Sequence, residues 1–359
     1  MRLPGGGLID RYLAAAVLGG AGVALAVLLA LFAFGSLVNE LEEVGRGGYT
    51  VALALEYVLL GLPTLAHQLL PVAALLGAML GLGALAAQRE LVALRAAGAS
   101  VGRLLAPVLL AALVLAGAAA ALGELVAPAA ERQARALRAA ALGGGGVGLE
   151  GSEGVWLRQG GRFVHAARAW ADGTLEEVTV YRLGPEGLAE VIRARRARRE
   201  EGGWLLEEVV RSRVAPEAVA SRRLERLRLR ELVDPALLGL AGERPRSLPV
   251  AELLPRVRRL ERSGLDVGPY ASALWAKLMA PWSTAVMVLL AVPFVLGPLG
   301  RTGVGPRLVA GTLVGMAYYL LSRGLAHAAL AYQLSPALAH ALPPLLFLGL
   351  GLALLRRVP

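Results

Sequence analysis

Long apolar runs that carry almost no charge recur along the chain and alternate with polar segments. Six such runs cover residues 12–38, 57–87, 104–123, 278–300, 308–329 and 336–355. Apolar runs of about 18 residues or more are long enough to cross the hydrocarbon core of a bilayer as helices. The pattern predicts a polytopic α-helical membrane protein with six transmembrane helices, three before and three after a polar region.

Prolines and charges predict where some of these spans bend or end. Pro63 and Pro71 interrupt the early part of the run 57–87, which is longer than the roughly 20 residues needed to cross a bilayer. Its first third is therefore expected to lie at the membrane interface or to bend. Glu124 and Pro128 predict the end of the third span, because proline lacks the N–H that continues a helix.

The polar region between residues 131 and 246 contains no apolar run long enough to span a membrane. Segments rich in β-forming residues alternate there with glycine-containing turns, at residues 156–159, 162–166, 178–183, 188–195 and 204–210. Gly160 and Gly161 separate the first two segments, as in a β-hairpin. The spacing predicts an all-β domain of about 120 residues built as an antiparallel meander.

These segments predict three parts along the chain. Residues 1–127 hold the first three transmembrane helices, and residues 128–248 form the β-domain. Residues 249–359 hold the last three, preceded by an amphipathic connector helix on which Leu253 and Val257 share a face. The predicted architecture is thus three spans, an inserted β-domain, and three further spans.

A charged segment at residues 88–100 separates the second and third spans. Arg89, Glu90 and Arg95 surround an apolar pattern with helical spacing that begins at Leu91. The segment predicts a short helix in the loop between two spans, and we refer to residues 88–100 as the elbow.

The net charge of +10 comes from an arginine-rich, lysine-poor composition. In a membrane protein such an excess indicates cytoplasmic loops and contacts with lipid headgroups, so a nucleic-acid partner is not expected. One set of span ends is basic, and it carries Arg2, Arg11, Arg89, Arg95, Arg103, Arg301, Arg307, Arg356 and Arg357. The positive-inside rule places this set, with the elbow and both termini, in the cytoplasm and the β-domain outside.

Motifs for catalysis and for cofactor binding are missing from the sequence. It has no cysteine, hence no disulfide framework and no thiolate metal site, and its four histidines lack metal-ligand spacing. No glycine precedes a lysine, so there is no P-loop. Residues 98–102 match G-x-S-x-G, but a helical segment and not a strand precedes the serine. We expect a non-catalytic chain without a cofactor of its own.

Two classes of function remain open from the residues alone. The chain could be a transport permease driven by a separate ATPase, or a membrane-anchored scaffold whose external β-domain binds a partner. An ion-coupled transporter is a weaker third reading, because such proteins tend to carry buried acidic residues, and the predicted span interiors contain none.

Several separated motifs are those of one known family. They are Asp10-Arg11-Tyr12, residues 70–78 and 80–83, Glu90-Leu91-Val92 with Ala97-Gly98, residues 154–158 and 162–165, residues 297–299, and residues 332–336. With this order of parts, the chain resembles the LptF/LptG permeases of the lipopolysaccharide export ATP-binding-cassette transporter, and its LptG branch more closely. The correspondence runs nearly end to end.

The resemblance implies a location, a substrate and partners. The location is the bacterial inner membrane of a Gram-negative cell, with a jellyroll-like β-domain in the periplasm. The partners are an LptF-like permease chain, an LptB-like ATPase dimer that binds the ATP and magnesium, and an LptC-like protein. Lipopolysaccharide would be extracted from the membrane and passed to a periplasmic bridge for outer membrane biogenesis. An LptF-type sibling, or a permease for another amphiphile, is the alternative within this class.

The resemblance also assigns a role to the elbow. Glu90 matches the acidic residue of the family's coupling helix, which docks in a groove on the ATPase, and Arg89, Leu91 and Arg95 lie beside it. A short helix there can transmit a rigid-body push when the ATPase dimer closes on ATP. The alternative is a solvated glutamate paired with a neighbouring arginine.

Three arginines are candidates for contact with lipopolysaccharide. Arg135 and Arg138 resemble basic family positions just beyond the third span, and Arg323 lies inside the fifth. Arginine can bind the phosphates of lipid A through two hydrogen bonds. The competing readings are a solvated helix face for the first two, and snorkelling to the headgroups for Arg323.

One departure from the family pattern concerns the outer end of the first span. Family members often carry lysines there, whereas this chain has Ser36, Glu42 and Glu43. These carboxylates would repel lipid phosphate unless a divalent cation bridges the two groups or their partners differ. The resemblance therefore does not fix the details of substrate engagement or the chemistry of the lipid A.

Overall fold

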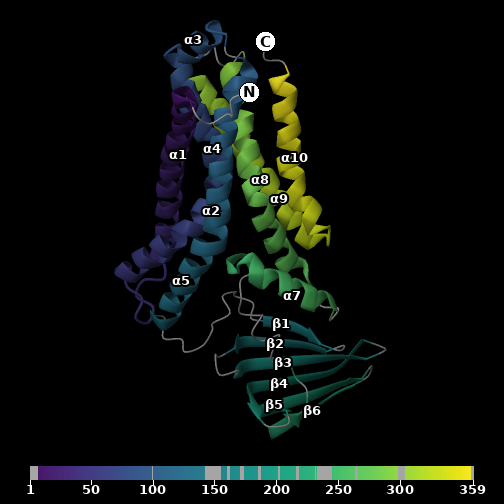
Figure 1. Cartoon of the computed structure of the whole chain (residues 1–359). Helices are drawn as coiled ribbons and strands as arrows, with labels where there is room; N and C mark the ends of the chain where they lie inside the picture. Colours follow the sequence, from purple (N-terminus) through teal and green to yellow (C-terminus); the bar gives the residue numbers. More distant parts are fainter. Residues whose placement is uncertain are drawn as a thin grey trace. The chain divides into compact units, whose positions relative to one another are not determined.

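The computed structural model of the chain describes residues 7–98, 100–141, 155–159, 162–169, 174–184, 187–200, 203–215, 218–230, 232, 245–262, 266–297 and 304–356. Six helical runs among them are long and apolar enough to cross a membrane, as predicted. These are α1 (Leu8–Leu41), α2 (Val51–Ala87), the continuous run of α4 (Val101–Ala121), the π-helical turn η1 (Leu122–Val126) and α5 (Ala127–Ala141), then α8 (Gly268–Leu296), α9 (Val304–Ala331) and α10 (Pro336–Leu355) (Figure 1).

The chain divides into two compact units, which we describe separately. The helical unit contains residues 1–43, 54–134 and 245–359, and the sheet unit contains residues 44–53 and 135–244. The predicted turn at Gly160 and Gly161 lies outside the described residues.

The core of the helical unit is built mainly from α2, α4 and α8. Leu75, Val108 and Met287, one from each of these helices, are among its most buried side chains. α8 packs against both α4 and α10 (Figure 1). Many large apolar side chains of α1, α9 and α10 point outward instead, as expected for helices whose surroundings are lipid hydrocarbon.

α2 continues through Pro63 and Pro71, so the residues before these prolines belong to the same helix as the span. One expectation about a helix end is wrong. The third span does not end at Glu124 and Pro128, because η1 joins α4 directly to α5. Transmembrane helices tolerate such prolines where neighbouring groups or local π geometry satisfy the freed carbonyls.

The fourth span also begins earlier than predicted. α8 starts at Gly268 and not at Leu278, and Lys277 lies inside it with only 7% of its side chain exposed. A charge normally marks the end of a span, but this ammonium has partners inside the protein.

The predicted connector helix is confirmed as α7 (Val250–Arg262), which follows a short 3-10 turn, η2 (Pro245–Ser247). Leu253, Val257 and Leu260 are its buried residues. Its other faces carry charged side chains, as the amphipathic pattern requires.

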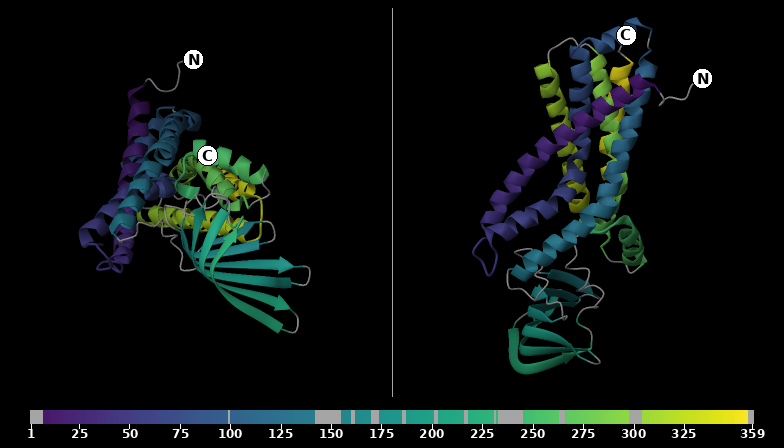
Figure 2. Two further views of the ribbon diagram at one scale, coloured as in Figure 1. Left: turned by 90° about the horizontal axis from the view of Figure 1, so that it is seen from below. Right: turned by 60° about the vertical axis from the view of Figure 1, so that its left-hand side comes forward.

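The β-domain is a six-stranded antiparallel sheet in sequential order, which confirms the predicted meander (Figure 2). The strands are β1 (Val155–Gln159), β2 (Arg162–Ala169), β3 (Leu175–Gly184), β4 (Gly187–Glu200), β5 (Gly203–Ala215) and β6 (Ala218–Leu229). β6 was not predicted, and β3, β4 and β5 are longer than expected. The jellyroll-like domain implied by the resemblance is represented, in the described residues, by this one sheet.

The buried face of the sheet contains an irregularity that four neighbouring strands share. Side chains in regular strands alternate between faces, yet residues three positions apart both enter the core here. The pairs are Leu175 and Val178 in β3, Ala194 and Ala197 in β4, Leu206 and Val209 in β5, and the partly buried Leu224 and Leu227 in β6. They face one another across the ladders.

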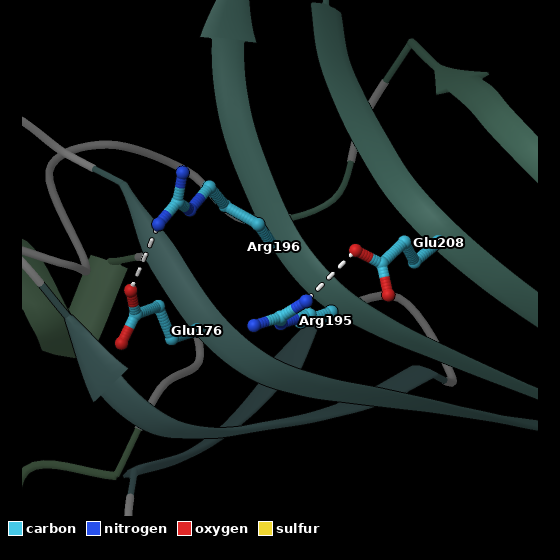
Figure 3. Close-up of polar contacts among 4 residues, drawn as sticks. All are labelled: Glu176, Arg195, Arg196 and Glu208. Atoms are coloured by element: carbon cyan, nitrogen blue, oxygen red, sulfur yellow. Dashed lines mark hydrogen bonds and ion pairs between the residues drawn. The ribbon is translucent and has the colours of Figure 1, made fainter.

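Charged residues occupy the positions between these apolar pairs. Glu177 and Glu208 adopt left-handed backbone conformations, with φ of 53° and 52°. At these two residues the alternation of side chains between the faces of the sheet shifts. Figure 3 shows the resulting ion pairs between strands: Arg196 lies 3.3 Å from Glu176, and Arg195 lies 3.0 Å from Glu208. These two ion pairs connect β4 to β3 on one side and to β5 on the other.

Candidate functional site: the elbow and the polar residues of the helical unit

The elbow contains a helix shorter than the predicted segment, α3 (Glu90–Ala96). Arg89 enters it in a left-handed conformation with φ of 57°, which turns the chain sharply after α2. Gly98, with φ of 90°, follows the helix, where a side chain would be strained. Ser100 then caps α4 by accepting a hydrogen bond of 3.2 Å from the Arg103 N–H.

One side of α3 is anchored in the helical unit and the other is charged. Leu91 is 4% exposed and belongs to the main apolar core. Arg89 and Arg95 are exposed, while Glu90 is half-buried and accepts a hydrogen bond of 3.4 Å from the Tyr12 hydroxyl. The elbow is therefore a short helix fixed to the spans by an apolar residue, with its charged side chains at the surface.

An ion pair beside the elbow joins the first and third spans. The Arg103 guanidinium lies 3.0 Å from the Asp10 carboxylate, and Asp10 is 3% exposed. A buried carboxylate needs such a partner. The pair fixes the beginning of α1 to the beginning of α4, next to the cap at Ser100.

Arg323 is held between two spans. Its guanidinium donates a hydrogen bond of 2.8 Å to the Gln68 side-chain oxygen and lies 5.4 Å from the centre of the Tyr319 ring. Partial desolvation and the positive charge of Arg323 lower the pKa of Arg246, which places a second guanidinium in the same region. Among the described residues, no carboxylate lies within ion-pair distance of either arginine.

Arg135 and Arg138 lie on α5, one turn apart, and both are half-buried. Each makes contacts within the structure. They belong to the sheet unit, whereas Arg323 and the elbow belong to the helical unit. The structure thus brings Glu90, Leu91 and the neighbouring arginines together, but it does not describe one site that unites all the predicted residues.

Sequence reasoning missed a group of polar residues inside the helical unit. Lys277 donates to the Gly123 carbonyl and lies 3.6 Å from the Glu124 carboxylate, whose other oxygen accepts a hydrogen bond of 2.7 Å from the Val250 N–H. The His67 ring lies against Gly123. One signal was present in the sequence: Lys277 is the only lysine among 37 lysine and arginine residues.

Comparison with known proteins decides the family. The family model described as lipopolysaccharide export system permease LptF/LptG matches residues 11–357. The chain belongs to the LptF/LptG family. As an LptF/LptG permease it is a transport subunit of the inner membrane, in keeping with its six candidate spans.

Two relatives of this LptF/LptG chain carry the name lipopolysaccharide export system permease protein LptG. The protein from Escherichia coli strain K12 is 32% identical over 355 residues, which cover 98% of both chains. The protein from Haemophilus influenzae is 31% identical over 343 residues, covering 95% of this chain and 96% of the relative. The similarity therefore extends over both the helical unit and the sheet unit.

Proposed function

We propose that this chain is an LptG-type permease subunit of an ATP-binding-cassette transporter that extracts lipopolysaccharide from the inner membrane. It pairs with an LptF-like chain and an LptC-like protein, and an LptB-like dimer binds and hydrolyses the ATP. The names of the two relatives support the LptG type over the LptF type. The substrate is then passed to a periplasmic bridge.

The proposed orientation follows from the arginines at the span ends. Basic residues flank the ends that carry the elbow and both termini, and the positive-inside rule assigns such ends to the cytoplasm. The β-domain then lies in the periplasm, and the elbow faces the compartment that holds ATP.

The observation that carries the proposal is the construction of the elbow. The helix α3 has 7 residues, is anchored by Leu91, and is followed closely by the capped start of α4. A force that the ATPase exerts on its charged side can therefore be transmitted directly to the third span. Glu90, Arg89 and Arg95 supply the charged contacts with the ATPase in this proposal, and Leu91 supplies the anchor.

Lipopolysaccharide contacts are proposed for Arg135, Arg138 and Arg323. For Arg323 the support is strongest, because Gln68 and Tyr319 orient a guanidinium that no described carboxylate neutralises. Such a group is suited to a phosphate of lipid A.

The proposal is tested with the complex reconstituted in proteoliposomes. Glu90→Lys places a cation where the ATPase groove is expected to meet a carboxylate, so lipopolysaccharide release should fall at least about tenfold. Thermal unfolding of the complex should be little changed, because Glu90 makes a single long hydrogen bond, of 3.4 Å, to the residues that the structure describes. ATP hydrolysis and lipopolysaccharide release are measured on the same vesicles.

Two controls separate the possible causes. Tyr12→Phe removes the hydrogen bond to Glu90 but keeps the carboxylate, and it should behave like the unsubstituted chain. Glu56→Lys makes the same charge change at an exposed position near the start of α2. Unchanged release by Glu90→Lys contradicts the coupling role, and a chain that purifies without an ATPase or a second permease chain supports a scaffold instead.

A further inference from the structure

A polar node lies inside the helical unit, and neither the elbow nor the proposed lipid contacts account for it. We define the node as Gly123, Glu124, Val250 and Lys277. These residues come from η1, from the start of α7 and from α8, so the node joins elements on both sides of the inserted β-domain in the sequence.

The carbonyl that Lys277 contacts is left free by the π-helical turn. The Ala127 N–H donates to the Leu122 carbonyl, five residues earlier. With the same five-residue spacing, the N–H of residue 128 would donate to the Gly123 carbonyl. Residue 128 is proline, however, and has no N–H. The Lys277 ammonium occupies this vacant position and donates to Gly123.

Glu124 connects the turn to α7. One of its carboxylate oxygens accepts a hydrogen bond of 2.7 Å from the Val250 N–H, the first residue of that helix. The N-terminus of a helix carries partial positive charge and exposed N–H groups, so a carboxylate is well suited to cap it. The other oxygen lies 3.6 Å from the Lys277 ammonium.

α2 supports the turn from a third direction. The His67 ring nitrogen Nδ1 lies 2.9 Å from the Ala119 carbonyl, and a side chain at Gly123 would meet the ring at 2.6 Å. One helical turn before His67, Thr64 donates a hydrogen bond of 3.0 Å to Glu131 on α5. The position of η1 is thus defined by contacts from α2, α7 and α8.

Stability alone is a weak reason for this arrangement. Burying an ion pair often contributes little net stability compared with apolar residues of similar size, whereas it can specify one geometry. Of the lysine and arginine residues in the sequence, all are arginine except Lys277. Lysine presents a compact ammonium with three donors, which fits between a carbonyl and a carboxylate better than a planar guanidinium does.

The node also lies on a continuous helical path from the elbow. Ser100 caps α4, and α4 passes through η1 into α5 without a break. This path is a route by which a displacement of α3 would reach the turn that Glu124 and Lys277 hold, and through it the start of α7.

We propose that Glu124 and Lys277 are positioning residues that pass movement of the elbow along α4 to the connector helix α7 and to α8. The inference rests on the proposed transport function. It assigns to Glu124 and Lys277 the link between the ATPase contact at the elbow and α7, the helix that follows the β-domain in the sequence. Loss of the node then reduces lipopolysaccharide released per ATP hydrolysed, while the chain stays folded.

The first test removes only the link to α7. Val250→Pro deletes the N–H that Glu124 accepts, and proline is well tolerated at the first position of a helix. Val250→Ala keeps the N–H and is the matched control. In proteoliposomes containing the complete complex, Val250→Pro should lower release per ATP roughly two- to thirty-fold relative to Val250→Ala. Equal values for the two variants overturn the proposal.

The second test separates positioning from simple satisfaction of buried groups. Pro128→Ala gives residue 128 an N–H for the Gly123 carbonyl and leaves Glu124 and Lys277 paired. A triple variant adds Glu124→Gln, whose amide oxygen still accepts from Val250, and Lys277→Met, so that no buried charge is left unpaired. Replacing a whole buried ion pair is often close to neutral, so Pro128→Ala and the triple variant should unfold at similar temperatures. The proposal expects lower release per ATP in the triple variant.

Matching release per ATP in Pro128→Ala and the triple variant shows that Glu124 and Lys277 only satisfy buried groups, and this overturns the positioning role. A triple variant that unfolds earlier and also releases less also counts against it, since stability then accounts for the loss. If the unsubstituted complex moves no lipopolysaccharide, the proposed function fails. If the unsubstituted complex releases lipopolysaccharide normally and one of the results above is found, the inference fails while the proposed function stands.

Discussion

Substitution of Gly77 by alanine tests the close contact between α1 and α2. A Cβ atom at Gly77 would lie 2.1 Å from the Ala21 Cα atom, and one at Gly20 would lie 2.2 Å from the Gly77 carbonyl oxygen. At Gly81 the nearest atom, the Ala16 carbonyl oxygen, would be 2.0 Å away. All of these neighbours are backbone atoms, so rotation of a side chain cannot relieve the overlap. The two helices touch through glycines, as small residues in membrane helices allow.

The cost of Gly77→Ala follows from these distances. Carbon atoms that are not bonded pack best at about 3.5–4.0 Å, so α1 and α2 must separate by roughly 1.5 Å at this point. Overpacking a tight interface costs about 1–3 kcal/mol, and backbone overlap places this site near the upper end. Alanine gains up to about 1 kcal/mol over glycine within a helix. The net loss is about 2 kcal/mol.

Thermal unfolding of the purified chain in detergent measures this loss. A decrease of about 2 kcal/mol should lower the unfolding temperature by about 4–8 °C. Gly61→Ala is the matched control, because it lies in the same helix and a Cβ there meets nothing within 4 Å. An unfolding temperature for Gly77→Ala equal to or above that of Gly61→Ala refutes the packing argument.

Two further predictions concern the sheet unit and the lipid contacts. Glu190→Gln should destabilise the chain by about 1–3 kcal/mol in thermal unfolding, because Glu190 is 4% exposed and pairs with both Arg182 and Arg211. Glu200→Gln, which alters an exposed ion pair, should change stability much less, and equal effects contradict the burial argument. Arg323→Gln should reduce the lipopolysaccharide that co-purifies with the complex severalfold in lipid mass spectrometry, with at most a small decrease in the unfolding temperature from the lost contacts with Gln68 and Tyr319. Undiminished lipid would show that this arginine has only a structural role.

The sequence predicted the spans well because hydropathy depends on local composition. It failed at Lys277 and Glu124 for a physical reason that local composition cannot reveal. Each charge was read as the boundary of a span, since an isolated charge inside a membrane is costly. Their partners lie far away along the chain: Lys277 contacts a carbonyl 154 positions earlier, and Glu124 contacts an amide 126 positions later.

Strand β6 was missed because of its apolar spacing. Leu224 and Leu227 are three positions apart, a separation typical of helices and not of alternating strands. The structure shows that the neighbouring strand has the same offset at Leu206 and Val209, so each leucine still meets an apolar partner. A pattern that looks irregular in one strand becomes regular only when the adjacent strands are compared.

The candidate site was partly accessible from the sequence. The charge pattern around Glu90 indicated a short helix between spans, and the structure contains α3 there. The anchoring of Leu91 and the ion pair between Asp10 and Arg103 depend on packing between spans. No periodicity in the elbow itself could have indicated them.

The shared offset in the sheet has a consequence for how the β-domain assembles. A regular strand that slips by two residues presents the same faces to its neighbours, so alternation between the faces does not by itself exclude such a slip. In this sheet, a slip of β4 would set Ala194 and Ala197 against mismatched positions in β3 and β5 together. It would also separate Arg195 and Arg196 from their glutamates on both sides. The native alignment of β4 therefore satisfies the apolar and the charged pairs with both neighbours at once, and a shifted alignment loses both kinds of pair.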